Sequence, residues 1–218
     1  MPKKAFFSLP AREQDAFFDA ALGHFSRTPF DQASLSSLLR ECEMAKGTFY
    51  LYFQHKMDLY EYLVETVLTM KGVYLKTRLI RQPDDFFHLF ESLLRLETAF
   101  RLEHPVFHRL LSMALDPRFS PLPPRRIREL EWERDQRFHG MLVRDQLKGK
   151  IATDADAHLV TFISGLMLEE FHRYVKQRLD VKKGGPDGSP DQTPSQATAE
   201  SSRRFMQLFR RALASKNR

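Results

Sequence analysis

The stretch MAKGTFYLYFQHK, residues 44–56, decides the fold of this chain. It places small, polar, aromatic and basic side chains between two segments that carry ordinary apolar helical stripes. Phe49 and Phe53 lie four residues apart, so a helix would point both toward a core. A short second helix reached through a tight connection is the geometry of a helix-turn-helix. We therefore predict that residues 45–51 form the second helix of such a motif.

Two further helices are predicted upstream. Apolar residues recur at Phe17, Ala21 and Phe25, the four-residue spacing of a core-facing helix. This helix should end before Pro29, because proline disfavours the helical conformation in the residue that precedes it. Ser34 is a favourable N-cap for the next helix. The apolar face of that helix consists of Leu35, Leu38 and Leu39.

The polar side chains of this region are suited to contact with duplex DNA. Lysines pair with phosphates, and hydroxyl groups donate hydrogen bonds to phosphate oxygens. Gly47 lets a backbone approach closely, and the start of the helix near Ala45 carries a partial positive charge. The predicted DNA-binding residues are Ser34, Ala45, Lys46, Gly47, Thr48, Tyr50, Tyr52, His55 and Lys56.

These residues resemble the DNA-binding domain of TetR-type transcriptional regulators, over about residues 8–60. The family pattern has a capping Ser or Thr, an apolar pair, and then Gly-Thr-Phe-Tyr-x-Tyr-Phe-x-x-Lys. It is matched here by Ser34, Leu35, Leu38, Gly47, Thr48, Phe49, Tyr50, Tyr52, Phe53 and Lys56. The resemblance implies a DNA-binding regulator that works as a dimer.

The sequence departs from the family pattern at the turn. Cys42–Glu43 replaces the usual Ala-Gly pair, and a non-glycine residue at this point implies mild backbone strain or a different turn. Ala45 replaces the usual Ser or Thr cap, which removes about 1 kcal/mol of helix stabilisation. Leu39 stands where a small alanine is usual, so the helix is expected further from its neighbour.

We predict an all-α fold with a helix-turn-helix domain at residues 1–58 and a helical regulatory and dimerisation domain at residues 59–218. Lys3 and Lys4 are interpreted as a flexible arm that reaches DNA or as a solvated tail. Thr153 and Asp156 resemble a capping box at the start of a helix that runs to about residue 179. Residues 182–198 are rich in Gly, Pro and Ser and are predicted to be a flexible loop, followed by a helix at residues 201–214.

The helix after residue 157 is apolar nearly all round, so it must be covered on two sides. Two such helices from each of two subunits form a four-helix interface, as the resemblance implies. The predicted interface residues are Phe162, Leu166, Phe205, Leu208 and Phe209. A membrane-surface role for the last helix is the alternative.

The resemblance also implies a small-molecule effector in the C-terminal domain. The many aromatic residues of this domain suggest an apolar or aromatic effector, although aromatic residues at helical spacing usually form part of the core. The candidate pocket residues are Phe86, Phe90, Phe100, Phe107, Phe119 and Trp132, with Glu170 as a candidate buried acid facing a ligand or a partner subunit.

Nothing in the sequence indicates an enzyme, a cofactor or a metal site. No phosphate loop, nucleophile motif or cysteine–metal spacing is present. No apolar stretch is long enough to span a membrane, and the N-terminus lacks the apolar core and the small-residue cleavage site of a signal peptide, so a cytoplasmic protein is expected. Cys42 is interpreted as a small core residue, with redox sensing as the alternative.

The predicted function is a homodimeric, ligand-responsive repressor of a palindromic operator. Residues 1–60 hold seven basic and seven acidic side chains and are neutral overall. The prediction of DNA binding therefore depends on the positions of individual side chains and not on the net charge of +6. This neutrality keeps open a protein-interaction adaptor that has lost operator binding. A ligand-binding bundle with catalytic activity is a second alternative.

Overall fold

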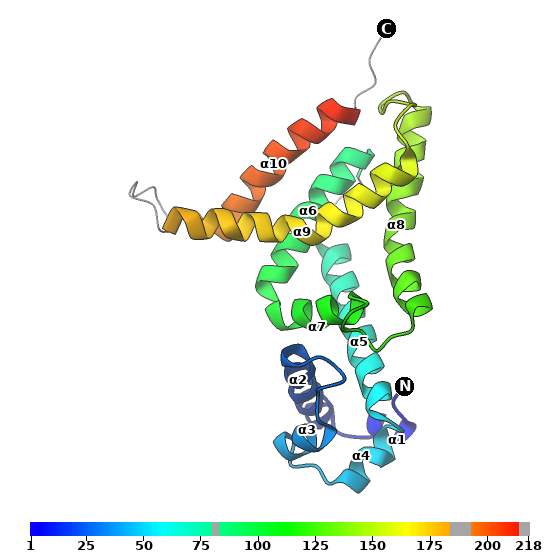
Figure 1. Cartoon of the computed structure of the whole chain (residues 1–218), viewed down its shortest axis with the longest axis vertical. Helices are drawn as coiled ribbons and strands as arrows, with labels where there is room; N and C mark the ends of the chain where they lie inside the picture. The colour runs from blue at the N-terminus through cyan, green and yellow to red at the C-terminus, as the bar shows by residue number, and fades with distance from the viewer. Residues whose placement is uncertain (80–82, 184–192, 214–218) are drawn as a thin grey trace. The chain divides into compact units, whose positions relative to one another are not determined.

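The computed structural model describes residues 1–79, 83–183 and 193–213, and within them every regular element is a helix (Figure 1). Side chains at 131–135, 137 and 181–183 fall outside this description. The all-α prediction is confirmed. The helices are α1 (Lys4–Phe7), α2 (Ala11–Arg27), α3 (Leu35–Glu41), α4 (Lys46–Tyr52), α5 (Lys56–Arg78), α6 (Phe86–Glu103), α7 (Pro105–Leu115), α8 (Pro124–Leu147), α9 (Ala157–Lys183) and α10 (Pro194–Leu213).

The chain forms two compact units that are not continuous in sequence. The first comprises Met1–Val73 and His104–Glu129, and the second Tyr74–Glu103 and Leu130–Arg218. Helices α5 and α8 therefore each contribute residues to both units. The predicted domain boundary at residue 58 stays a prediction.

In the first unit, aromatic side chains form the core beneath the helix-turn-helix. Phe25 stacks on Phe30 at 6.1 Å between ring centroids, and Tyr60 meets Phe25 edge-on at 5.3 Å. Helix α2 packs against α3 and α7, and α1 packs against α4. Helix α2 ends at Arg27, directly before Thr28 and Pro29, as the proline predicts.

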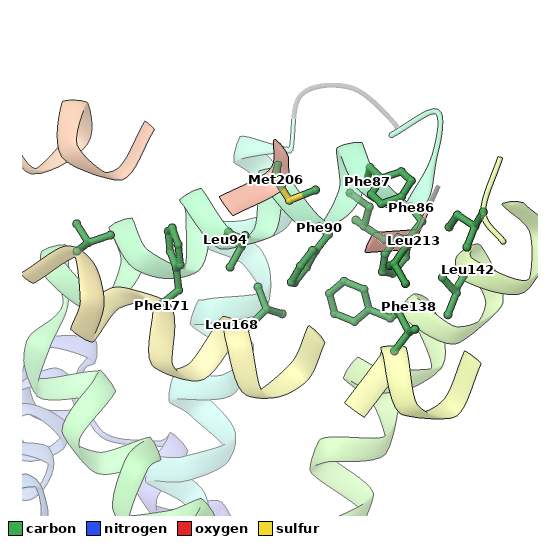
Figure 2. Packing of buried hydrophobic residues seen from close by; sticks show 14 of the residues in the cluster. Phe86, Phe87, Phe90, Leu94, Phe138, Leu142, Leu168, Phe171, Met206 and Leu213 are labelled. Carbon is green, nitrogen blue, oxygen red and sulfur yellow. The ribbon is translucent and has the colours of Figure 1, made fainter. Parts of the chain in front are cut away.

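In the second unit, α6, α9 and α10 pack against one another, and α8 adds side chains to the same core. Figure 2 shows Phe90 of α6 beside Phe138 of α8, with Leu168 and Phe171 of α9 on one side. The ring centroids of Phe90 and Phe138 lie 5.9 Å apart, nearly perpendicular. Phe209 of α10 lies 5.2 Å from Phe90, so α10 is part of this core.

A buried carboxylate fixes the start of α6. Asp145 of α8 is fully buried, and its Oδ2 accepts a hydrogen bond of 2.6 Å from the backbone N–H of Phe86. Arg144 lies 3.4 Å from the other carboxylate oxygen. Because the first N–H groups of a helix have no partner within it, Asp145 satisfies one of them from another helix. The bond connects the first turn of α6 to α8.

Three predicted boundaries are wrong. Helix α10 begins at Pro194, because Thr193 and Gln196 form a reciprocal capping box that the loop prediction overlooked. Helix α9 begins after Asp156, whose Oδ1 accepts from the N–H groups of His158 and Leu159, so Asp156 and not Thr153 is the cap. Helix α9 also continues to Lys183. The part of the predicted loop at 184–192 lies outside the described residues.

Within the described residues no helix is sufficiently long and apolar to traverse a lipid bilayer.

Candidate nucleic-acid interface

The first helix of the motif is capped as the sequence predicts. Ser34 precedes α3, and its Oγ accepts a 3.2 Å hydrogen bond from the backbone N–H of Ser37. Leu38 and Leu39 of this helix are buried, with 0% and 5% of their surface exposed. The cap and the apolar pair together set where α3 begins and which side of it faces the core.

The turn between α3 and α4 places a glutamate in a left-handed conformation. Glu43 has a φ of 52°. Its N–H donates to the carbonyl of Arg40, and the N–H of Met44 donates to the carbonyl of Leu39 at 2.8 Å. These two bonds form a Schellman motif, whose left-handed position is usually occupied by glycine. The predicted strain at Glu43 is therefore present, at a cost of about 1–2 kcal/mol.

Helix α4 is held by two buried rings and presents its other side to solvent. Phe49 and Phe53 have no exposed surface and stack on each other at 5.5 Å. Lys46 and Gly47 are exposed, and 42% of Tyr50 is exposed. Thr48 and Tyr52 are partly buried. Ala45 precedes the helix and makes no side-chain cap, as predicted.

Nothing within the chain requires a glycine at position 47. A Cβ atom added there would meet no heavy atom within 4 Å. Glycine inside a helix costs about 1 kcal/mol relative to alanine, and no close approach within this chain offsets that cost. The open face at Gly47 is accessible to the backbone of a partner molecule.

Lys56 is engaged within the fold. Its Nζ donates to the backbone carbonyls of Phe30 at 2.7 Å and Ala33 at 2.9 Å, and it lies 4.1 Å from the centroid of the Phe30 ring. These contacts connect the start of α5 to the loop before α3. An ammonium has three N–H groups, so the predicted phosphate contact uses the third and stays a prediction.

Asp58 stabilises the connection that follows α4. Its Oδ2 accepts from the backbone N–H groups of Gln54 at 2.9 Å and His55 at 3.3 Å. Burial of the carboxyl is the largest single influence and raises its pKa, but the N–H groups of Gln54 and His55 and the N-terminal ammonium of Met1 together lower it by more, so the net shift of the Asp58 pKa is downward. The side chain of His55 is exposed beside this connection.

The comparisons with known proteins agree with this geometry. Residues 17–63 match the family described as bacterial regulatory proteins, tetR family. This part of the chain is therefore similar in sequence to the DNA-binding domain of the TetR family. An uncharacterized HTH-type transcriptional regulator, YvdT of Bacillus subtilis (strain 168), is 31% identical over 94 residues, which cover 43% of this chain and 45% of that protein. The match thus spans less than half of that relative's length.

Solved structures extend the similarity of fold to the whole chain. A TetR-family regulator from Chloroflexus aurantiacus J-10-FL aligns with a TM-score of 0.79 at 20% identity, covering 98% of this chain and 99% of that one. The ketosteroid transcriptional regulator KstR2 of Mycobacterium tuberculosis aligns with a TM-score of 0.62 at 12% identity, covering 96% and 98%. At these identities the likeness shows the fold alone. The fold of the whole chain and the sequence of residues 17–63 therefore point to the same group of proteins.

The predicted pocket residues of this chain do not form one site. Phe86, Phe90 and Phe100 are core residues with at most 2% of their surface exposed. Phe107 belongs to α7 in the first unit, where its ring stacks on His104 at 5.3 Å. Phe119 is exposed in the loop after α7. The side chain of Trp132 lies outside the described residues.

Glu170 is not buried within the chain, contrary to one of the two interpretations made from the sequence. Its side chain is 53% exposed and pairs with Arg173 at 3.1 Å. It falls four residues after Leu166 and eight after Phe162, so these three residues share one exposed side of α9. Its position leaves open the other interpretation, in which it faces a partner subunit.

The five predicted interface residues divide into two groups. Phe162, Leu166 and Leu208 are exposed, at 60%, 43% and 67%. Phe205 and Phe209 instead pack into the core of the second unit, where Phe205 lies 5.9 Å from Phe171. The sequence could not separate these groups, because both α9 and α10 carry apolar residues on more than one side.

Cys42 is partly buried at the end of α3. Burial, with a smaller contribution from the charge of Glu41, raises the pKa of the thiol. A thiol with a raised pKa is a weaker nucleophile at neutral pH, because less thiolate is present. The position thus fits a small packed residue better than a redox sensor.

Proposed function

We propose that this chain is a homodimeric, cytoplasmic repressor that binds a palindromic operator and releases it when a small molecule binds. The observation that carries the proposal is the exposed side of α4, which presents Lys46, Gly47 and Tyr50 to solvent. The opposite side of this helix is fixed in the core by the buried rings of Phe49 and Phe53. A second helix presented in this way enters the major groove, and two copies related by a two-fold axis bind half-sites about one helical turn apart.

The proposal predicts that Lys46 contacts a phosphate. Duplexes are first selected from random DNA, and binding of the full chain is then measured by fluorescence anisotropy over a series of salt concentrations. Lys46→Met is expected to weaken binding about tenfold for all sequences and to reduce the slope of log K against log salt by about 0.9. Lys76→Met is the matched control, because Lys76 is exposed on α5 but lies outside the helix-turn-helix. Lys56 is unsuitable for this test, since its replacement also breaks two bonds within the fold.

A different outcome distinguishes the adaptor alternative. If the wild-type chain binds every duplex with the same weak affinity and selects no sequence, operator binding is excluded. An unchanged salt slope in Lys46→Met, with tight wild-type binding, would remove Lys46 from the set of phosphate contacts.

The dimer is supported by the exposed apolar side of α9. Leu159, Phe162 and Leu166 are exposed at 54%, 60% and 43% on one helix. Contiguous exposed apolar surface of this kind marks an interaction site. A second copy of the chain is the occupant that the family's two-fold symmetry favours.

A hollow of about 830 Å³ is the best candidate for the effector site in the second unit. It lies between α6 and the start of α10, and we call it the α6–α10 hollow. Leu79, Leu96 and Leu102 give it an apolar lining. Arg95 lines it as well, with its side chain free of any ion pair or hydrogen bond within the described part of the chain. An apolar molecule that carries one anionic group matches this combination.

A matched pair of ligands tests this assignment. Decanoate is expected to raise the melting temperature and to release bound DNA, whereas decanol at the same concentration is expected to do neither. Arg95→Glu should abolish the decanoate response, because it replaces the cation by a carboxylate. Arg109→Glu, on the exposed side of α7, is the control. Equal responses to decanoate and decanol, or a response that survives Arg95→Glu, would exclude Arg95 as the anion-binding group. One structural relative is described as a ketosteroid transcriptional regulator, which supports an apolar effector.

A further inference from the structure

Helix α4 is too short to hold its own orientation. It spans Lys46–Tyr52, and Ala45 gives its first turn no side-chain cap. A helix of two turns is marginal by itself, since nucleation is costly and each end leaves backbone groups unsatisfied. The carbonyl of Phe49 accepts from the N–H of Phe53, which leaves the later carbonyls in need of partners.

The N-terminal segment supplies these partners. The backbone N–H of Lys3 donates to the carbonyl of Tyr52 at 2.7 Å. The Nζ of the same residue donates to the carbonyl of Tyr50 at 2.8 Å. A cation at the C-terminal end of a helix also interacts favourably with the helix dipole. Lys3 therefore caps α4 with both its backbone and its side chain.

Phe6 adds an apolar anchor on the same side. It is fully buried, 5.2 Å from the ring of Phe53 and 5.9 Å from that of Tyr52. Its ring also meets Tyr62 of α5 edge-on at 5.5 Å. The short helix α1 is thus wedged between the end of α4 and the start of α5. The interpretation of Lys3 as part of a flexible arm or a solvated tail is wrong, because Lys3 bonds to α4 and Phe6, three residues later, belongs to the core.

We propose that residues Lys3–Phe7, the N-terminal brace, fix the angle at which α4 meets DNA, and that Lys3 and Phe6 are positioning residues for DNA binding. The brace holds the last turn of the helix that carries Lys46 and Tyr50, so its release lets that face tilt. This inference rests on the proposed DNA-binding function. In this proposal Lys3 acts on DNA binding through α4, because its ammonium donates to the Tyr50 carbonyl, and the salt series below tests whether it also contacts phosphate. Lys4, whose side chain is exposed and makes no hydrogen bond or ion pair within the described residues, is the matched control.

The first measurement needs no DNA. Amide hydrogen exchange is followed by mass spectrometry in peptides that cover residues 46–53 and residues 17–25. In Lys3→Met the exchange of the 46–53 peptide is expected to rise at least threefold, while that of the 17–25 peptide stays unchanged. Phe6→Ala should raise exchange in 46–53 further. Unchanged exchange in 46–53 for Lys3→Met would overturn the brace, whatever the protein binds.

The second measurement separates positioning from direct contact. Binding of a selected duplex by the full chain is measured over a salt series for the wild type, Lys3→Met and Lys4→Met. Lys3→Met is expected to weaken binding about three- to tenfold with an unchanged salt slope, because fewer molecules hold a binding-competent α4. A slope reduced by about 0.9 would mean that Lys3 contacts phosphate, against the proposal. If the wild type selects no duplex, the proposed function fails while the exchange result still decides the brace.

Discussion

Replacing Phe90 by alanine is expected to lower the free energy of unfolding of the second unit by about 3–5 kcal/mol, the range for a large aromatic residue removed from a core. Phe90 has no exposed surface, and its ring lies within 6.0 Å of those of Phe86, Phe138, Phe205 and Phe209. The cavity left behind would be lined by rings from α6, α8 and α10, which cannot all move inward. Urea denaturation followed by circular dichroism measures the loss.

Phe119→Ala is the control, since 45% of Phe119 is exposed and its loss is expected to change stability by less than about 0.5 kcal/mol. The experiment also distinguishes core from ligand contact for the aromatic set predicted from the sequence. A Phe90→Ala chain that keeps its stability but no longer responds to an effector would return Phe90 to the candidate pocket.

Phe162→Asp is expected to weaken self-association at least about 100-fold, the equivalent of about 2.7 kcal/mol. Phe162 is the most exposed of the three apolar residues on this side of α9, and a buried aromatic residue at the centre of an interface typically contributes this much. A carboxylate in its place would be desolvated at the contact and would face its own copy near the two-fold axis. Sedimentation velocity at micromolar concentrations should show that Phe162→Asp is monomeric. Because the monomer binds only one half-site at a time, its affinity for a palindromic duplex should be lower than that of the wild type.

Leu147→Asp provides the matched control for the dimer. Leu147 is 84% exposed at the end of α8, on a different helix from Phe162, and the same change of charge there should leave the sedimentation coefficient unaltered. If Phe162→Asp sediments like the wild type, the interface lies elsewhere. If both variants dissociate, added charge and not position is the cause.

Local chemistry made the helix-turn-helix predictable from sequence. The Ser34 cap, the inward Phe49 and Phe53, the left-handed Glu43 and the uncapped Ala45 each follow from neighbours within a few residues. Long-range partners were not predictable in this way. Nothing in the sequence near Lys3 indicates that it bonds to carbonyls about fifty residues later in the chain, or that Lys56 bonds to the loop before α3. The core position of Phe6 was not predictable either, because its ring partners in α4 and α5 are also distant in sequence.

The second unit shows a different limit. Helical periodicity identified α6, α9 and α10 but could not decide which aromatic residues face the shared core and which face outward. Phe205 and Leu208 lie three residues apart on α10, yet one packs against Phe171 and the other is 67% exposed. The early start of α10 was detectable, because Thr193–Gln196 fits the capping-box pattern. It was overlooked because residues 182–198 as a whole are rich in Gly, Pro and Ser and were therefore predicted to be a loop.

Because the first unit is discontinuous in sequence, it cannot finish folding during synthesis until its second segment has been made. Residues 1–73 leave the ribosome first, but α7, which packs on α2, follows only after the thirty residues 74–103 of the other unit. The side of α2 that α7 covers therefore stays exposed to water until residue 115 has emerged. Ribosome-associated chaperones that bind apolar surface would meet the nascent chain during this interval. A polypeptide that stops at residue 58 would keep that surface exposed permanently.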